Sequence, residues 1–312
     1  MDRPDPFPLA AQAPATPHAG PDAALAQLRA IPGARLLRAV LALLQRAWPA
    51  LAVRLASRVF LTPLPAKWPR SGTPWPAPWR AARWPFEGGS LTVYRLGQRT
   101  SGPVLLLVHG WGGNAVQMRP LAEQIAAQGL CPVLIDLPAH GRSAGWKTTL
   151  PQFARAIEYV GARLAQEGEP VHAIAAHSLG ATASAFAAAR GLPVERMVLL
   201  APAASPPAYT HLFARVFGLS ERTRAAMQAR IEAREAALMP QFEPSALAAR
   251  LGIPVLVAHD RDDRVNSFAD GEAYVQALPR AELFATEGLG HNRLLKDPQL
   301  IARVAAFLRG AG

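Results

Sequence analysis

Ser178 lies in a stretch whose residue types suit a nucleophilic serine. The apolar run 171–175 before it is typical of a buried strand, and the small residues 181–189 after it favour a helix. A sharp turn between the two would expose the serine hydroxyl, and such a turn requires small flanking residues, here Ala176 and Gly180. The free N–H groups of the following helix would stabilise developing negative charge. An ordinary buried serine is the alternative for this stretch taken alone.

A serine nucleophile requires a base, and the base requires an acid that orients it. His291 follows the expected strand 282–286, and the short loop between them contains two glycines that let it bend back across the strand ends. Three aspartates follow the expected strand 254–259, namely Asp260, Asp262 and Asp263. The chain order is therefore serine, acid, histidine, which is one of the known orders of the triad. Strand position alone does not choose among the three aspartates.

Two backbone N–H groups are candidates for holding the oxyanion of a tetrahedral intermediate. One belongs to Leu179, the residue after the serine. The other belongs to the loop 109–113, which follows the expected strand 104–108 and contains three glycines that permit unusual backbone angles. We choose the N–H of Trp111, whose indole would then shape the substrate pocket or wedge under the segment that covers it.

The elements that would position these residues alternate along the chain. We expect strands at 91–96, 104–108, 132–137, 171–177, 197–201, 254–259 and 282–286, and helices at 115–128, 150–167, 179–190, 267–278 and 298–309. This alternation predicts an α/β protein with a mostly parallel, doubly wound sheet. The segment 204–250 interrupts the alternation and is expected to form a small helical cap over the ligand-binding edge. Candidate pocket residues are Trp111, Tyr209, His211 and Phe213.

The N-terminal part of the chain differs in composition from the rest. Residues 1–22 are rich in Pro and Ala and are predicted to be disordered, and residues 23–61 are predicted to form two helices broken at Pro49. We favour packing of these helices on the main domain, and the alternative is peripheral contact of a basic amphipathic helix with a membrane. The remainder of 23–87 is a linker whose prolines exclude a regular helix or a central strand, so the main domain is expected to span 88–312.

Composition excludes several classes of protein. Half of the 312 residues are apolar, which suffices for one large domain with appendages. The net charge is +11, but the arginines are scattered and only three of the 33 basic residues are lysines, so we predict no nucleic-acid partner. Because no uncharged apolar run reaches about 18 residues and the start lacks a signal-peptide core, we expect a cytoplasmic protein. The single cysteine, Cys131, excludes an intrachain disulfide, and the oligomeric state stays open.

Residues 88–310 resemble the α/β-hydrolase superfamily of serine hydrolases, in particular its esterases and lipases. The resemblance is carried by His109–Gly113, Asp136–Ser143, Ala176–Gly180, His259–Val265 and Gly290–His291. It implies the α/β-hydrolase fold with an eight-stranded, mostly parallel sheet, no cofactor or metal, and an acyl-enzyme on Ser178. It also places the acid four residues after the histidine that ends the strand, which is Asp263. The usual glycine at position 176 is an alanine here, as in some bacterial lipases.

These features together predict a hydrolase of carboxylic esters that acts on a small-molecule acyl substrate. Ser178 would attack the carbonyl carbon, His291 would move the proton, and Asp263 would orient the imidazole. The same residues would also serve a thioesterase, a C–C hydrolase, an aminopeptidase or an acyltransferase, and a non-catalytic scaffold on the same fold is a further alternative. His109 and His259 are expected to make structural hydrogen bonds. Asp136 is expected to fix the turn after its strand, and the side chain of His177 is expected to point away from Ser178.

Overall fold

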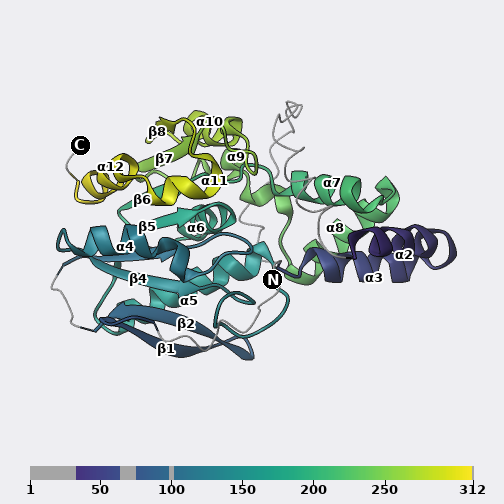
Figure 1. The fold of residues 1–312 in the computed structure, drawn as a ribbon, viewed down its shortest axis with the longest axis horizontal. Coiled ribbons are helices and arrows are strands. Elements are labelled where there is room, and N and C mark those ends of the chain that lie inside the picture. The colour runs from purple at the N-terminus through teal and green to yellow at the C-terminus, as the bar shows by residue number, and fades with distance from the viewer. Residues whose placement is uncertain (1–32, 64–74, 98–101, 311–312) are drawn as a thin grey trace, which may run out of the picture.

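The computed structural model describes residues 33–63, 75–97 and 102–310, and its centre is a single eight-stranded sheet (Figure 1). The strands are β1 (Trp79–Phe86), β2 (Gly89–Leu96), β3 (Val104–Val108), β4 (Cys131–Asp136), β5 (Val171–His177), β6 (Arg196–Leu200), β7 (Val255–Asp260) and β8 (Ala281–Thr286). Their order is β1-β2-β4-β3-β5-β6-β7-β8, in which β2 runs antiparallel to both of its neighbours and the remaining pairs are parallel. The mostly parallel sheet expected from the sequence is confirmed.

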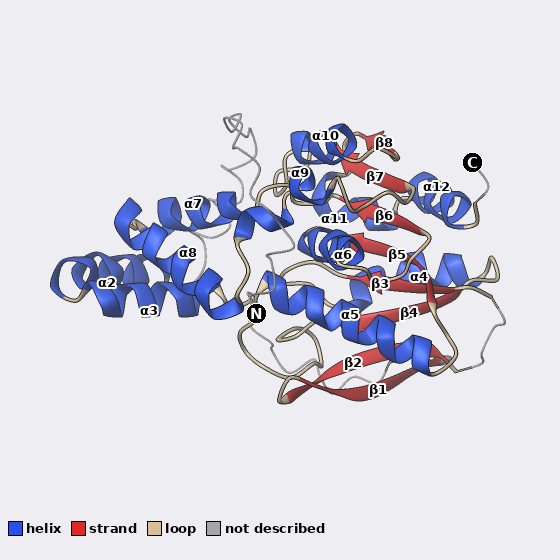
Figure 2. Cartoon of the chain, turned by 180° about the vertical axis from the view of Figure 1, so that it is seen from behind, coloured by secondary structure: helices blue, strands red, loops and turns tan. Residues whose placement is uncertain are grey.

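Helices cover both faces of this sheet (Figure 2). Against one face lie α5 (Leu150–Gln166), α6 (Leu179–Ala189) and α10 (Phe268–Ala277), and against the other lie α4 (Arg119–Ala126) and α12 (Pro298–Leu308). All five residues of β3 are buried, and they alternate between the two cores, with Leu106 in one and Leu107 in the other. A strand that is covered on both faces is apolar throughout. This is why the sequence of β3 is a continuous run of apolar residues and does not alternate between apolar and polar ones.

The first strand lies in the segment that the sequence analysis assigned to a linker. β1 contains Pro85 and pairs only with β2, so it forms the edge of the sheet, where a missing N–H donor is tolerated. Trp79 and Trp84 are buried in the two opposite cores. The prediction of a linker up to residue 87 is therefore wrong in its second half, and the sheet domain begins near residue 79.

A helical insertion separates β6 from β7, as predicted. It comprises α7 (Pro206–Phe217), α8 (Glu221–Glu235), the short 3₁₀ turn η3 (Met239–Phe242) and α9 (Pro244–Leu247). α7 begins with Pro206 at its first position and ends at Gly218, which adopts the left-handed conformation typical of a helix C-terminus. This insertion is called the cap below.

The two predicted N-terminal helices are α2 (Ala34–Ala47) and α3 (Pro49–Phe60), which we call the hairpin, and the chain breaks at Trp48 as the proline predicted. The hairpin packs on α7 and α8 of the cap through one apolar cluster, which includes Leu41, Ala56 and Phe217. Figure 1 shows the four helices together at one end of the molecule, beyond the sheet. The predicted disorder of residues 1–22 lies outside the described residues. Within the described ranges, no helix has the length and apolarity to cross a membrane.

Candidate active site

Ser178 occupies the turn between β5 and α6. Its φ of 55° and ψ of −130° form a strained conformation that a residue with a side chain rarely adopts. Two glycines allow the neighbouring backbone to come this close: a Cβ on Gly110 would lie 2.7 Å from the Ser178 Cβ, and one on Gly180 would lie 2.1 Å from the carbonyl oxygen of His109. Tight backbone packing therefore holds the serine, which is only 8% exposed.

His291 is within hydrogen-bond distance of both groups that a general base requires. Its Nε2 lies 3.0 Å from Ser178 Oγ, and its Nδ1 lies 2.7 Å from Asp263 Oδ2. If Nδ1–H donates to the carboxylate, Nε2 is left free to accept the serine proton. The residue belongs to α11 (Gly290–Arg293), a single helical turn, where the sequence analysis expected a loop. The structure thus brings together the serine, histidine and aspartate that the sequence analysis selected.

Asp263 has the contacts of an ionised carboxylate. Its Oδ1 accepts hydrogen bonds from the backbone N–H groups of Val265 at 2.8 Å and Asn266 at 3.0 Å. Burial by itself would raise the pKa of Asp263, but hydrogen bonds from His259 and His291 outweigh burial and hold this pKa well below its usual range. A negative charge is therefore kept against Nδ1 of the imidazole.

The other two aspartates hold the loop that carries the histidine. The carboxylate of Asp260 accepts hydrogen bonds of 2.7–3.0 Å from the Thr286 hydroxyl and the backbone N–H groups of Leu289 and Gly290. Asp262 accepts one from the backbone N–H of Gly288 at 2.8 Å. Burial opposes ionisation of Asp260, but these hydrogen bonds lower its pKa overall. All three carboxylates thus act on one loop, and of the three only that of Asp263 contacts the His291 imidazole.

His177 contacts the base, a contact that the sequence analysis missed. The sequence predicts only that its side chain points away from Ser178. In the structure its Nε2 lies 2.9 Å from the backbone carbonyl of His291, and the two rings are 4.6 Å apart. Burial, and next the neighbouring His291, lower the pKa of His177 to about 3, so its imidazole is neutral and donates this hydrogen bond. The signal available in the sequence for a role at the site was the position of His177 directly before Ser178.

Asn266 is a second missed residue. Its Nδ2 donates to the Ala201 carbonyl at 2.8 Å and lies 3.4 Å from Ser178 Oγ, and its Oδ1 accepts a hydrogen bond from the Tyr209 hydroxyl. Asn266 is buried, and its position three residues after Asp263 gave no sign of this role. The amide therefore connects helix α7 of the cap to the serine hydroxyl.

The loop 109–113 is held under the site by two histidines. Burial lowers the pKa of His109 to about 4, so its ring is neutral, and its Nε2 accepts a hydrogen bond from the backbone N–H of Leu137. His140 Nε2 accepts one from the backbone N–H of Gly112 at 2.9 Å. Within the described ranges no hydrogen-bond acceptor is paired with the N–H of Trp111 or of Leu179. Both groups therefore remain the candidate oxyanion donors.

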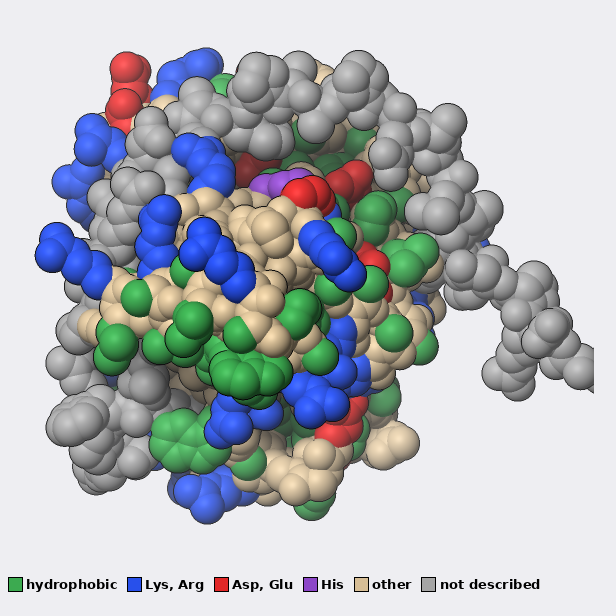
Figure 3. Space-filling view, turned by 90° about the vertical axis from the view of Figure 1, so that its right-hand side faces the viewer, with side chains coloured by type: hydrophobic (Ala, Val, Ile, Leu, Met, Phe, Trp, Pro, Cys, Tyr) green, Lys and Arg blue, Asp and Glu red, His purple; other side chains and the backbone are tan. Residues whose placement is uncertain are grey.

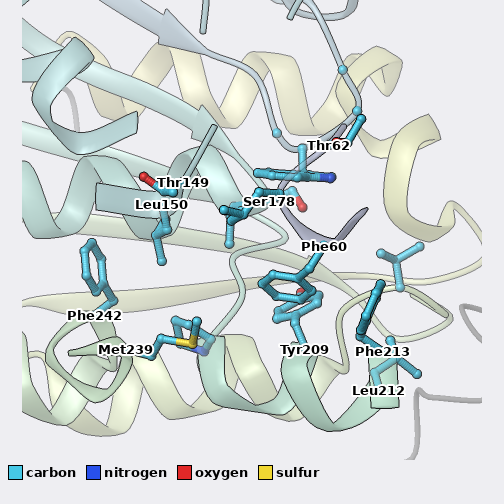
Figure 4. A pocket seen from close by; sticks show the side chains of 18 of the residues that line it. Phe60, Thr62, Thr149, Leu150, Ser178, Tyr209, Leu212, Phe213, Met239 and Phe242 are labelled. Carbon is cyan, nitrogen blue, oxygen red and sulfur yellow. The ribbon is translucent and has the colours of Figure 1, made fainter. Parts of the chain in front are cut away.

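A cavity of about 780 Å³ adjoins Ser178 and His291 (Figure 4). Its wall is largely apolar, and besides these two residues it comes mainly from the loop with Trp111, the start of α5, the cap and the end of α3. The cap side chains that line it include Tyr209, Leu212, Phe213, Met239 and Phe242. Three of the four predicted pocket residues are thus in the wall.

His211 was predicted in the pocket, and this is wrong. On helix α7 the residues Tyr209, Leu212 and Phe213 share the face toward the cavity, whereas His211 points outward. Its side chain is 57% exposed and lies 4.0 Å from Glu221. The sequence of α7 alone does not set the rotation of the helix about its axis, because that rotation depends on what the helix packs against.

The arrangement provides a nucleophile, a base, an orienting carboxylate and an apolar space next to them. Asp136, which the sequence analysis assigned to a turn, indeed accepts from the backbone N–H groups of Ala115 and Arg142, both at 2.8 Å. In the described part of the chain, no cluster of histidine, cysteine or acidic side chains has a geometry for holding a metal ion. The hydrogen bonds of Ser178, His291 and Asp263 have the geometry that nucleophilic attack by a serine hydroxyl requires.

The sheet order, the turn at Ser178 and the helical insertion after β6 are those of the α/β-hydrolase fold. In agreement, the model of a family described as alpha/beta hydrolase fold matches residues 103–226. The chain therefore has the α/β-hydrolase fold.

Several known esterases resemble this chain at low sequence identity. The chain is 24% identical over 254 residues to a pimeloyl-acyl-carrier-protein methyl ester esterase of Chromobacterium violaceum. The aligned region covers 70% of this chain and 97% of that protein. An esterase of Pyrococcus furiosus superimposes with a TM-score of 0.60 at 16% identity, covering 80% of this chain and 97% of the other. Est1E of Butyrivibrio proteoclasticus, solved with ferulic acid, gives a TM-score of 0.56 at 19% identity, covering 74% and 97%. The structural matches establish the fold alone.

Proposed function

We propose that this protein hydrolyses carboxylic esters with an apolar acyl group through an acyl-enzyme on Ser178. One observation carries the proposal: a continuous chain of hydrogen bonds runs from Asp263 through His291 to Ser178 Oγ, which lies at an apolar cavity. The methyl ester esterase of Chromobacterium violaceum supports ester hydrolysis as the reaction class.

The reaction proceeds in two halves. Ser178 Oγ attacks the ester carbonyl carbon while His291 Nε2 takes its proton, and Asp263 stabilises the imidazolium that forms. The backbone N–H groups of Leu179 and Trp111 hold the oxyanion, and the imidazolium then protonates the departing alcohol. A water molecule that His291 deprotonates attacks the acyl carbon, which releases the acid and restores the serine.

The size and apolar wall of the cavity suit the acyl group of an ester substrate. Its volume of about 780 Å³ lies within the range of about 300–1,000 Å³ that is typical of small-molecule sites. Aliphatic and aromatic side chains dominate the wall, so each methylene of an acyl chain placed there gains about 0.8 kcal/mol by leaving water. We therefore expect kcat/KM to rise with acyl length until the cavity is filled.

A labelling experiment tests the proposal directly. A fluorophosphonate should react with the native protein, and mass spectrometry should locate the adduct on Ser178, whereas Ser178→Ala should not react. p-Nitrophenyl acetate, butyrate, octanoate and laurate measured alongside will report acyl preference, and matched octanoyl thioester and anilide will separate esterase from thioesterase and amidase. An adduct on another residue, or folded protein that does not react, would falsify the proposal.

A further inference from the structure

The hairpin has two apolar faces, and the cap covers only one of them. On the inner face Leu41, Ala52 and Ala56 are fully buried. On the outer side large hydrophobic side chains are open to solvent: Leu36 is 70% exposed and Trp48 is 63% exposed, and the others are Val40, Leu43 and Leu51. Of the seven large hydrophobic residues exposed in the described ranges, these make five, and the remaining two, Val116 and Trp146, lie separately on the sheet domain.

The spacing shows that the exposed residues on α2 form a stripe. Leu36, Val40 and Leu43 follow one another at intervals of four and three, so they share one side of the helix. Trp48, at the bend between the two helices, and Leu51, in the first turn of α3, continue the exposed apolar surface beyond the end of α2. We call these five residues the outer face.

All charged residues of the hairpin itself have one sign. Residues 33–62 contain five arginines and no aspartate or glutamate. Arg35, Arg46, Arg54 and Arg58 are solvent-exposed. Figure 3, which looks onto this end of the molecule, shows hydrophobic side chains gathered among Lys and Arg side chains. Long arginine side chains beside apolar ones allow the guanidinium groups to reach phosphates while the apolar groups are buried below them.

This combination discriminates among the occupants of the outer face. A second copy of the chain related by a two-fold axis would bring the same arginines together without an acidic partner, which is unfavourable. An anionic lipid surface offers both an apolar layer and negative headgroups, and tryptophan is favoured at its boundary. We propose that the outer face of the hairpin docks on an anionic lipid surface, with the two helices lying on the membrane and not crossing it.

The hairpin also connects this surface to the cavity. The last residues of α3, including Val59 and Phe60, line the cavity wall, and Phe60 packs edge-to-face on Phe213 with 5.3 Å between ring centroids. The element that docks therefore also forms one wall of the cavity. In so far as the proposed ester hydrolysis holds, the substrate class is an ester whose acyl chain partitions into a bilayer.

Vesicle flotation of the full chain tests the docking. Vesicles of phosphatidylcholine with phosphatidylglycerol should carry the protein upward, vesicles of phosphatidylcholine alone should carry much less, and high salt should release it. The triple variant Leu36→Gln/Leu43→Gln/Trp48→Gln should lower the bound fraction about tenfold or more, because it removes the apolar contribution while keeping every arginine. The matched control Val116→Gln/Trp146→Gln removes exposed hydrophobic residues elsewhere and should float like the unmodified protein.

The outcomes separate docking from catalysis. Hydrolysis of soluble p-nitrophenyl acetate should be unchanged in the triple variant, which also shows that the variant is folded. Failure of the full chain to float, or equal flotation of the triple variant, overturns the docking. A dimer in light scattering that the triple variant converts to a monomer also overturns it, because a second copy then covers the outer face. If Ser178 resists the fluorophosphonate while the protein floats, the docking stands and the proposed hydrolysis fails.

Discussion

The turn at Ser178 and the hairpin α2–α3 are held by different forces. At the turn, backbone lies directly on backbone at Gly110 and Gly180, and buried polar groups such as Asp263 and Asn266 make specific hydrogen bonds. The hairpin is held by aliphatic and aromatic packing along one side, with few side-chain hydrogen bonds to the cap, among them Arg38 to the Val216 carbonyl. Directional contacts fix atoms for chemistry, whereas one-sided apolar packing leaves a second surface available for binding. The two regions should therefore respond differently to substitution.

The largest effect should come from Ser178 itself. Ser178→Ala removes the nucleophile, so we expect kcat to fall by about 10⁵–10⁶. The free energy of unfolding should change little, because the substitution only deletes a hydroxyl from a small side chain. Steady-state kinetics and urea denaturation of the same preparation measure both quantities, and substantial turnover by the folded variant would exclude Ser178 as nucleophile.

The next effect should distinguish the three aspartates. Asp263→Asn should lower kcat by about 10⁴, because the imidazole loses the carboxylate that selects its tautomer. Asp262→Asn should have a small effect, and Asp260→Asn should mainly lower stability, since its carboxylate holds three groups of the loop. Comparing kcat for the three folded variants checks this, and a deepest loss at Asp260 or Asp262 would show that the assignment of the acid is wrong.

Asn266 tests whether the cap communicates with the turn. Asn266→Ala removes the amide near Ser178 Oγ and should lower kcat by about 10- to 100-fold at nearly constant KM, because the hydroxyl loses a positioning contact. Tyr209→Phe removes only the hydroxyl that binds this amide and should cost less than about tenfold. The rate of fluorophosphonate labelling should fall in the same order. An unchanged labelling rate in Asn266→Ala would confine the residue to a structural role.

Phe60 tests the contribution of the hairpin to the cavity. Phe60→Ala enlarges the cavity at the wall that α3 forms, so KM for p-nitrophenyl laurate should rise by about tenfold through lost apolar contact, while kcat/KM for the acetate stays the same. Leu43→Ala, on the outer face of the same hairpin, is the matched control and should leave both esters unaffected. Equal losses on short and long esters would mean that Phe60 supports the fold and not the acyl chain.

The smallest effect concerns pH and stability. Burial lowers the folded-state pKa of His177 to about 3 from an ordinary value of 6.5, so below pH 6.5 the unfolded chain binds a proton that the folded chain does not. The contribution of His177 to the free energy of unfolding is therefore fully present above pH 6.5 and decreases as the pH falls toward 3. His177→Gln keeps a donor for the His291 carbonyl and should reduce the slope of unfolding free energy near pH 5 by about 1.4 kcal/mol per pH unit. An unchanged slope in urea titrations would mean that His177 is charged in the folded protein.

The sequence by itself determined the strands from β2 to β8, the helices that cover the sheet, the order of serine, acid and histidine, and the break at Pro49, because periodicity, proline and glycine act locally on the backbone. It also placed the base and the acid on loops after two successive strands, and parallel strands bring such loops to one edge of the sheet. The prediction of a cytoplasmic location stays a prediction.

Tertiary structure decided what depends on contacts between distant segments. Only the assembled sheet made β1 an edge strand that accepts Pro85, and only packing oriented α7 so that Tyr209 faces the cavity and His211 faces solvent. The amide of Asn266 reaches Ser178 across 88 positions of sequence. Likewise, both faces of the hairpin are apolar in the sequence, and the position of the cap decides which face is buried and which is left open, since side-chain burial depends on the neighbours that the fold supplies.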